Sequence, residues 1–155
     1  MTGINKMSNS SNNQQDFQSC IDKLTEMAET RGEPFKVLIV DDEEWVREVF
    51  KDFCGVTSAI EVKLAGGGEE ALKLAAQNQY DIITLDLIMP EMSGLDVLAE
   101  IKKVSPKVPV WVITGNSTDR LVEEAGILGA SRVIYKPVVL HDFIAELVGA
   151  FSARM

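Results

Sequence analysis

Five side chains that could do chemistry together each close a short apolar run in this sequence. Asp41 and Asp42 are adjacent, Asp86 and Thr114 follow later runs, and Lys136 precedes a proline. Taken singly, an aspartate or threonine at such a place is most often a turn or helix-cap residue. Two carboxylates about 4 Å apart repel by about 4 kcal/mol at an effective dielectric of 20, so a cluster of three binds protons or a cation. If they converge, carboxylate oxygens with water suit Mg²⁺.

The elements that must position these side chains alternate regularly along the chain. Short aliphatic runs, typical of buried parallel strands, alternate with longer segments that carry an apolar stripe at helical spacing. Five repeats of strand and helix predict a parallel sheet covered on both faces, with a ligand site at the carboxyl ends of its strands. The predicted strands lie near residues 36–40, 60–64, 81–85, 109–113 and 131–135.

The order of the motifs adds a resemblance to a known family. Asp-Asp, then Asp-x-x-Met-Pro-x-Met-x-Gly, then Thr, then Lys-Pro, across residues 35–152, resembles the receiver domain of response regulators. The resemblance implies a CheY-like, flavodoxin-like (βα)5 fold: a doubly wound α/β domain whose five parallel strands are ordered 2-1-3-4-5. It places the receiver domain at 34–155, after an extra N-terminal helix.

The resemblance also implies a metal site and a phosphoacceptor. Asp86 matches the phosphoacceptor, and Asp42 and Asp86 are expected to bind Mg²⁺ directly. The backbone carbonyl of Ile88 would be the third protein ligand, and Asp41 would act through a metal-bound water.

Two further residues match family positions that contact the phosphoryl group. Lys136 matches the lysine that neutralises phosphoryl oxygens, and its bond to Pro137 is expected to be cis. Thr114 matches the hydroxyl that moves toward the phosphoryl group on activation.

By this resemblance the chain is a receiver that takes a phosphoryl group from a histidine kinase or a histidine phosphotransfer protein. It would then bind a downstream protein through the face of its last strand and last two helices, or form a homodimer. Phosphorylation and dephosphorylation of its own aspartate would be the only reactions, so it is not expected to be an enzyme with an external substrate. The chain ends at Met155, directly after the last predicted helix, which favours a stand-alone receiver.

Two alternatives stay open. The chain could be the receiver of a longer regulator with a DNA-binding or enzymatic output domain. It could also be a phosphatase of the haloacid dehalogenase type, although those enzymes resemble Asp-x-Asp at the first strand, whereas here the two aspartates are adjacent.

The sequence departs from the family pattern at two places. Many receivers have an aromatic residue three positions before the lysine, where this chain has Val133; Tyr135 stands directly before Lys136 instead. Ile88 and Asn116 lie two residues past the aspartate and the threonine, where family side chains help to orient the hydrolytic water. Because an isoleucine side chain cannot orient water, we expect slow dephosphorylation.

The first 33 residues form a separate segment. Residues 1–15 are rich in Ser, Asn and Gln and are predicted to be disordered. Over about 16–30, apolar residues recur at helical spacing and predict an amphipathic helix that docks on the domain or on a second copy. The stripe consists of Phe17, Cys20, Ile21, Leu24, Met27 and Ala28.

The composition and charge of the chain limit the kinds of partner and site that we expect. The formal net charge is −9, so direct binding to nucleic acid is not expected. No apolar run approaches the ~20 residues of a membrane span, and a cytoplasmic protein is expected. Cys20 and Cys54 lack the spacing of a zinc site.

The remaining distinctive residues have ordinary interpretations. His141 is interpreted as a surface or cap residue, and Trp45 and Trp111 as core residues. Gly66, Gly67 and Gly68 lack the lysine of a phosphate-binding loop and are interpreted as a flexible connection.

Overall fold

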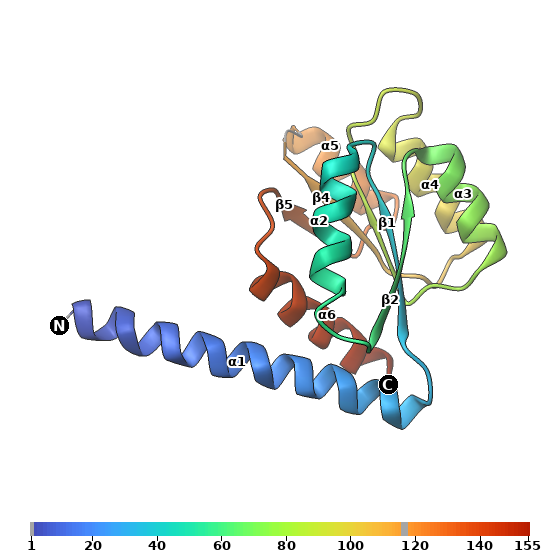
Figure 1. Ribbon diagram of the computed structural model, residues 1–155. Helices are drawn as coiled ribbons and strands as arrows, with labels where there is room; N and C mark the ends of the chain where they lie inside the picture. The colour runs from blue at the N-terminus through green and yellow to red at the C-terminus, as the bar shows by residue number, and fades with distance from the viewer. Residues whose placement is uncertain (1, 116–117) are drawn as a thin grey trace.

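The chain alternates strand and helix after one long N-terminal helix (Figure 1). The structure is a computed structural model that describes the backbone of residues 2–115 and 118–155, and the side chains of residue 14 and of residues 16 onward outside the same gap. The strands are β1 (Phe35–Val40), β2 (Ile60–Ala65), β3 (Ile82–Leu85), β4 (Val110–Thr114) and β5 (Arg132–Tyr135). The helices are α1 (Thr2–Arg31), α2 (Glu44–Cys54), α3 (Gly68–Gln77), α4 (Gly94–Val104), α5 (Asp119–Ile127) and α6 (Leu140–Arg154).

The five strands form one parallel sheet in the order β2-β1-β3-β4-β5, as the sequence predicted. Val40, the last residue of β1, pairs with Ala65 on one side and with Leu85 on the other. The carboxyl ends of β1 and β3 therefore stop at the same level. Strand order reverses at β1, and a ligand site in a doubly wound fold is expected beside such a point.

Helices cover both faces of the sheet, so each central strand is buried on both sides. In β1, Val37 and Ile39 pack toward α2 and α6, while Leu38 and Val40 pack toward α3 and α4. This alternation follows from the two-residue period of a strand. The first core holds a cluster of aromatic rings, with Phe35 stacked on Phe151 at 4.1 Å between centroids. These two cores hold the carboxyl edge of the sheet in place.

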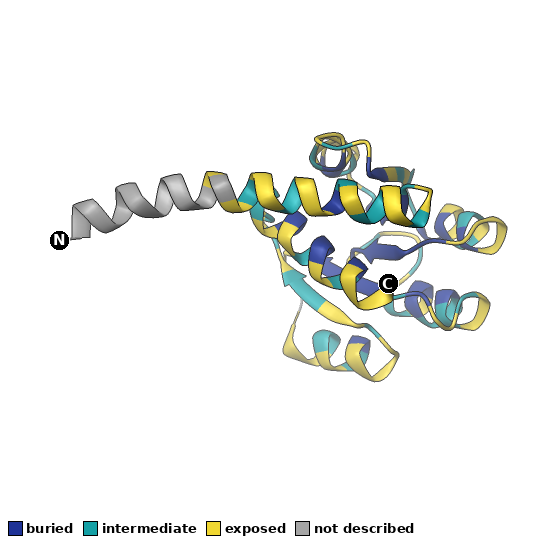
Figure 2. Cartoon of the chain, turned by 90° about the horizontal axis from the view of Figure 1, so that it is seen from below, coloured by how far each residue is buried: buried dark blue, intermediate teal, exposed yellow. Residues whose placement is uncertain are grey.

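Helix α1 docks along α6 and is anchored at its C-terminal end (Figure 1). Leu24 is fully buried between the helix and the first core, as the predicted apolar stripe requires. Arg31 makes a bidentate ion pair with Asp81 at the start of β3, with both N–O distances 2.9 Å. In the burial view, exposed residues alternate with buried and half-buried ones along the coloured part of α1 (Figure 2).

Helix α1 is longer than the sequence predicted. Its helical backbone begins at Thr2, whereas disorder was predicted for residues 1–15 and a helix for about 16–30. Once a helix is nucleated, each further residue adds a backbone hydrogen bond at little cost, so the docked half can extend the helix into a polar segment. No helix in the described part of the chain is both long enough and apolar enough to cross a membrane.

The prediction that Trp45 belongs to the core is wrong, since 66% of its surface is exposed. Helix α2 buries Val46, Phe50 and Cys54 at intervals of four residues. Trp45 lies one residue from that stripe, about 100° around the helix, and its indole N–H donates to Glu43. The other tryptophan, in β4, is buried as predicted.

Candidate functional site

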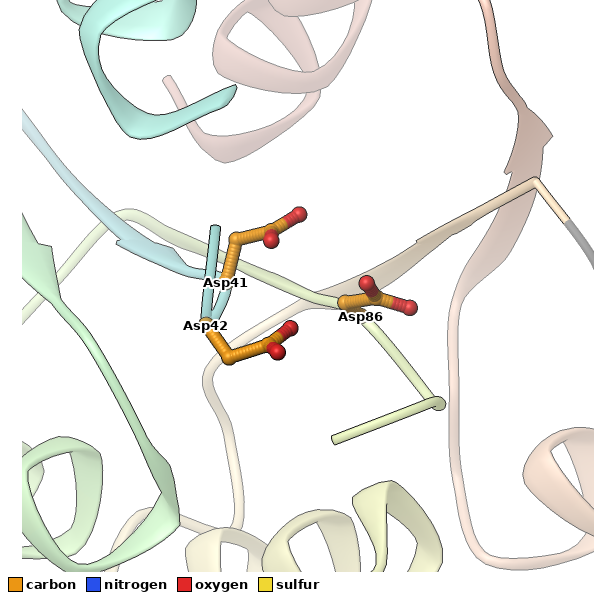
Figure 3. Close-up of side chains that lie close together, drawn as sticks. All are labelled: Asp41, Asp42 and Asp86. Carbon is orange, nitrogen blue, oxygen red and sulfur yellow. The ribbon is translucent and has the colours of Figure 1, made fainter. Parts of the chain in front are cut away.

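Three aspartates meet at the carboxyl edge of the sheet, as predicted (Figure 3). Asp41 and Asp42 follow β1, and Asp86 follows the neighbouring strand β3. One carboxylate oxygen from each lies within 4.8 Å of the other two. Asp41 and Asp86 are buried and Asp42 is half-buried. The register of β1 and β3 explains this convergence, because the two strands end side by side.

Lys136 bridges two of these carboxylates from the end of β5. Its Nζ donates to Asp41 Oδ2 at 2.9 Å and to Asp86 Oδ2 at 3.2 Å. Burial alone would lower the pKa of the Lys136 ammonium, but its hydrogen bonds to the two carboxylates and their charges outweigh burial and raise it. The ammonium therefore stays charged next to the cluster. Its peptide bond to Pro137 is cis, which confirms that prediction.

The surroundings of the Asp86 carboxyl disfavour its charged form and raise its pKa. Burial raises its pKa, and the negative charge of Asp41 raises it further. The Ile88 N–H, which donates to Asp86 Oδ1 at 3.0 Å, and the charge of Lys136 lower it by less. A buried carboxylate with too little positive charge around it favours binding a cation or forming a covalent bond that removes its charge.

Asp86 lines a cavity together with Thr114 and Lys136. Thr114 is the last residue of β4 and is fully buried, and its carbonyl accepts the backbone N–H of Lys136 at 2.9 Å. The sequence motifs did not assign a role to every residue that lines this cavity. Most of the residues without an assigned role lie directly beside the motif residues. The cavity is lined by Asp42, Glu43, Asp86, Ile88, Met89, Pro90, Thr114, Gly115 and Lys136.

A glycine holds the loop after Asp86 close to helix α4. A Cβ at Gly94 would lie 2.3 Å from Leu87 Cα, so no larger residue fits without moving the backbone. The Gly94 N–H also donates to the Leu87 carbonyl at 3.1 Å. The glycine of the Asp-x-x-Met-Pro-x-Met-x-Gly motif therefore sets the path of the chain that leaves Asp86.

The other residues that the sequence singled out do not line this cavity or lie outside the described residues. His141 is half-buried in the first turn of α6, where its ring lies 6.1 Å from that of Phe17. Val133 is half-buried in β5, and Tyr135 is 58% exposed. Asn116 lies outside the described residues.

The donor set fits a small divalent cation. Asp41, Asp42 and Asp86 offer carboxylate oxygens, and the half-buried Asp42 also lines the cavity. Mg²⁺ prefers such oxygen ligands and keeps several waters, for which a cavity that is open to solvent leaves room. Ile88 lines the same cavity, and its backbone N–H donates to Asp86 Oδ1 at 3.0 Å.

A doubly wound sheet with an acidic trio, a buried hydroxyl and a lysine at its carboxyl edge defines the receiver class of two-component signalling proteins. The family model for the response regulator receiver domain matches residues 37–148. The chain belongs to this family, which places it outside the phosphatases considered above.

Relatives in sequence and in structure agree with that assignment. The probable C4-dicarboxylate response regulator DctR of Bacillus subtilis is 36% identical over 108 residues, covering 69% of this chain and 48% of that protein. The chemotaxis protein CheY of Thermotoga maritima is 35% identical over 102 residues, covering 66% of this chain and 85% of that protein.

Among solved structures, a chain of the CheX–CheY–BeF3–Mg²⁺ complex from Borrelia burgdorferi matches with a TM-score of 0.70 and 29% identity. The match covers 76% of this chain and 90% of that one. Among the curated relatives, the chain spans about half the length of DctR and of the mycobacterial response regulators MprA.

Proposed function

We propose that Asp86 is the phosphoacceptor of this receiver, and that its phosphorylation changes which protein the chain binds. The observation that supports this most strongly is the position of Asp86. It is buried beside two other carboxylates, is bridged to one of them by Lys136, and lies in a cavity with the hydroxyl of Thr114.

The reaction is a displacement at phosphorus. An Asp86 carboxylate oxygen attacks the phosphorus of a phosphohistidine, the P–N bond breaks, and the imidazole nitrogen keeps the electron pair and takes up a proton. Lys136, already in contact with the attacking carboxylate, neutralises phosphoryl oxygens as the new P–O bond forms. The hydroxyl of Thr114 donates a hydrogen bond to one of these oxygens. The chain catalyses this transfer, and later hydrolysis, on its own aspartate only.

Asp41, Asp42 and Asp86, with the Ile88 carbonyl, would hold Mg²⁺. Bound there, Mg²⁺ would neutralise charge on the phosphoryl oxygens and on the cluster itself. The complex from Borrelia burgdorferi in which a chain matches this one contains CheY, Mg²⁺ and BeF3, which supports this site.

A histidine kinase or a histidine phosphotransfer protein would be the phosphoryl donor, in the cytoplasm. The downstream protein, or a second copy of the chain, would bind the face formed by α5, β5 and α6. Ile127 at the end of α5, Leu128 directly after it and Tyr135 at the end of β5 are exposed apolar or aromatic residues. An output domain on a longer protein is the second candidate, because DctR is only 48% covered by the match.

Intact-mass measurement after incubation with acetyl phosphate and MgCl2 tests the proposal. We expect the wild type to gain one phosphoryl group, Asp86→Asn to gain none, and the exposed-site control Asp52→Asn to gain one. An unmodified wild type, or a modified Asp86→Asn, would contradict the assignment.

A further inference from the structure

Arg47 in α2 contacts the backbone of the acidic pair instead of its carboxylates. Its Nη1 donates to the carbonyl oxygen of Asp41 at 2.7 Å, and the side chain is half-buried. Sequence analysis gave this arginine no role. Arg47 can therefore act on the acidic cluster in two ways, through its positive charge and through the backbone position that it holds.

The guanidinium lies over the first glycine of the Gly66–Gly68 run. A Cβ built on Gly66 would lie 3.3 Å from Arg47 Nη1, which is tighter than ordinary packing, and 3.5 Å from its Cζ. The Gly66 N–H donates to Glu70 Oε2 at 3.0 Å, so the glycine itself is held. A Cβ on the next residue, Gly67, would meet nothing within 4 Å. The run interpreted as a flexible connection therefore contains one position that makes room for Arg47.

Asp41 is held at four atoms. Its N–H donates to Ala65, Oδ1 accepts from the Glu43 N–H and Oδ2 accepts from Lys136. Arg47 supplies the fourth bond, to the carbonyl oxygen. Because a peptide group is planar, this last bond fixes the plane that joins Asp41 to Asp42. The direction in which the Asp42 side chain leaves the backbone depends on that plane.

We propose that Arg47 is a positioning residue for the divalent cation: clamped between the Asp41 carbonyl and Gly66, it holds Asp42 where its carboxylate meets that of Asp86. The inference rests on the proposed metal site. A planar guanidinium fits this narrow space and presents an N–H at a fixed angle, whereas an ammonium on a flexible stem does not.

The charge of Arg47 acts in the opposite direction to its geometry. A nearby positive charge repels Mg²⁺, so removing it would by itself tighten binding. Arg47→Lys keeps the charge and loses the planar clamp, and so isolates positioning. Gly66→Ala keeps the arginine and displaces it by a few tenths of an ångström. Gly67→Ala is the matched control for the glycine run, and Arg120→Lys, at an arginine 88% exposed, is the control for the substitution.

Thermal unfolding of the full chain at increasing MgCl2, without any phosphoryl donor, gives the dissociation constant from the rise in Tm. The same series gives the stability of the metal-free protein. Residues that orient metal ligands typically change affinity by about 10–100-fold, so we expect Arg47→Lys to weaken Mg²⁺ binding about tenfold. Gly66→Ala should weaken it by a smaller factor, and the two controls should match the wild type.

The outcomes separate this inference from the proposed function. If the wild type binds Mg²⁺ and both Arg47→Lys and Gly66→Ala bind it equally well, the positioning role is refuted while the metal site stands. If the Tm of the wild type does not rise with increasing MgCl2, both the positioning role of Arg47 and the metal site are refuted. A lower metal-free Tm with an unchanged dissociation constant would show that Arg47 stabilises the fold only, and would also refute the inference.

Discussion

Replacing the phosphoacceptor with its neutral isostere should stabilise the metal-free protein. One carboxylate oxygen of Asp86 lies within 4.8 Å of one from each of Asp41 and Asp42, and Asp86 Oδ2 is 3.2 Å from Lys136 Nζ. At an effective dielectric of 20, each repulsion is about 3.5 kcal/mol and the attraction about 5 kcal/mol. The two repulsions exceed the attraction, and burial, the largest cause of the raised pKa of Asp86, disfavours its charge further, so Asp86→Asn should raise the free energy of unfolding by about 2 kcal/mol.

The pH dependence provides a second check on the same variant. Because burial raises the pKa of Asp86, the folded protein binds a proton at higher pH than the unfolded chain does. The destabilisation is therefore present above the raised pKa and is relieved as the pH falls through it. The advantage of Asp86→Asn over the wild type should shrink across that range.

Urea denaturation without metal, at several pH values, measures both effects. Asp52→Asn, on the exposed side of α2, is the control and should change stability by less than about 0.5 kcal/mol. Mg²⁺ should stabilise the wild type more than Asp86→Asn, closing the gap. A loss of stability in metal-free Asp86→Asn would refute the reasoning, because it would mean that the ion pair with Lys136 outweighs repulsion.

Four further predictions follow from other parts of the molecule. Leu24→Ala, which removes the fully buried anchor of α1, should cost about 2–5 kcal/mol in chemical denaturation, whereas the exposed neighbour Lys23→Ala should cost little. Gly94→Ala should destabilise by at least about 1–3 kcal/mol, since its Cβ would meet the Leu87 backbone; wild-type stability would show that the loop yields freely. Burial raises the pKa of the Cys54 thiol to about 12, so iodoacetamide should label half-buried Cys20 first in the native protein, and equal labelling rates would contradict this. Ile88→Asn should shorten the acyl-phosphate lifetime, since an amide can orient water where isoleucine cannot, and equal lifetimes would refute that role.

Most of the fold could be predicted because its signals are local. Each strand is a short apolar run that ends in a polar or turn residue, and the helices between carry stripes at helical spacing. The convergence of Asp41, Asp42 and Asp86 then follows from the topology alone, since neighbouring parallel strands end at one edge. Burial of Leu24 was also predictable from the stripe on α1.

What could not be predicted depends on contacts between distant residues. The bond between Arg31 and Asp81 joins residues 50 positions apart, and neither has a local feature that indicates the other. The same holds for Arg47 against Gly66, where the glycine run suggested only flexibility. The error at Trp45 has a different cause: a large aromatic residue beside an apolar stripe was assigned to it, although it is turned about 100° away.

Mapping the modified residue tests the central claim most directly. Borohydride reduces an aspartyl phosphate to homoserine, which tandem mass spectrometry of peptides can locate in the chain. After treatment with acetyl phosphate and MgCl2, homoserine should be found at position 86 and at no other aspartate, and omitting MgCl2 should sharply reduce it. Homoserine at position 41 or 42, or none at any position in a protein that binds Mg²⁺, would contradict the assignment of Asp86 as the phosphoacceptor.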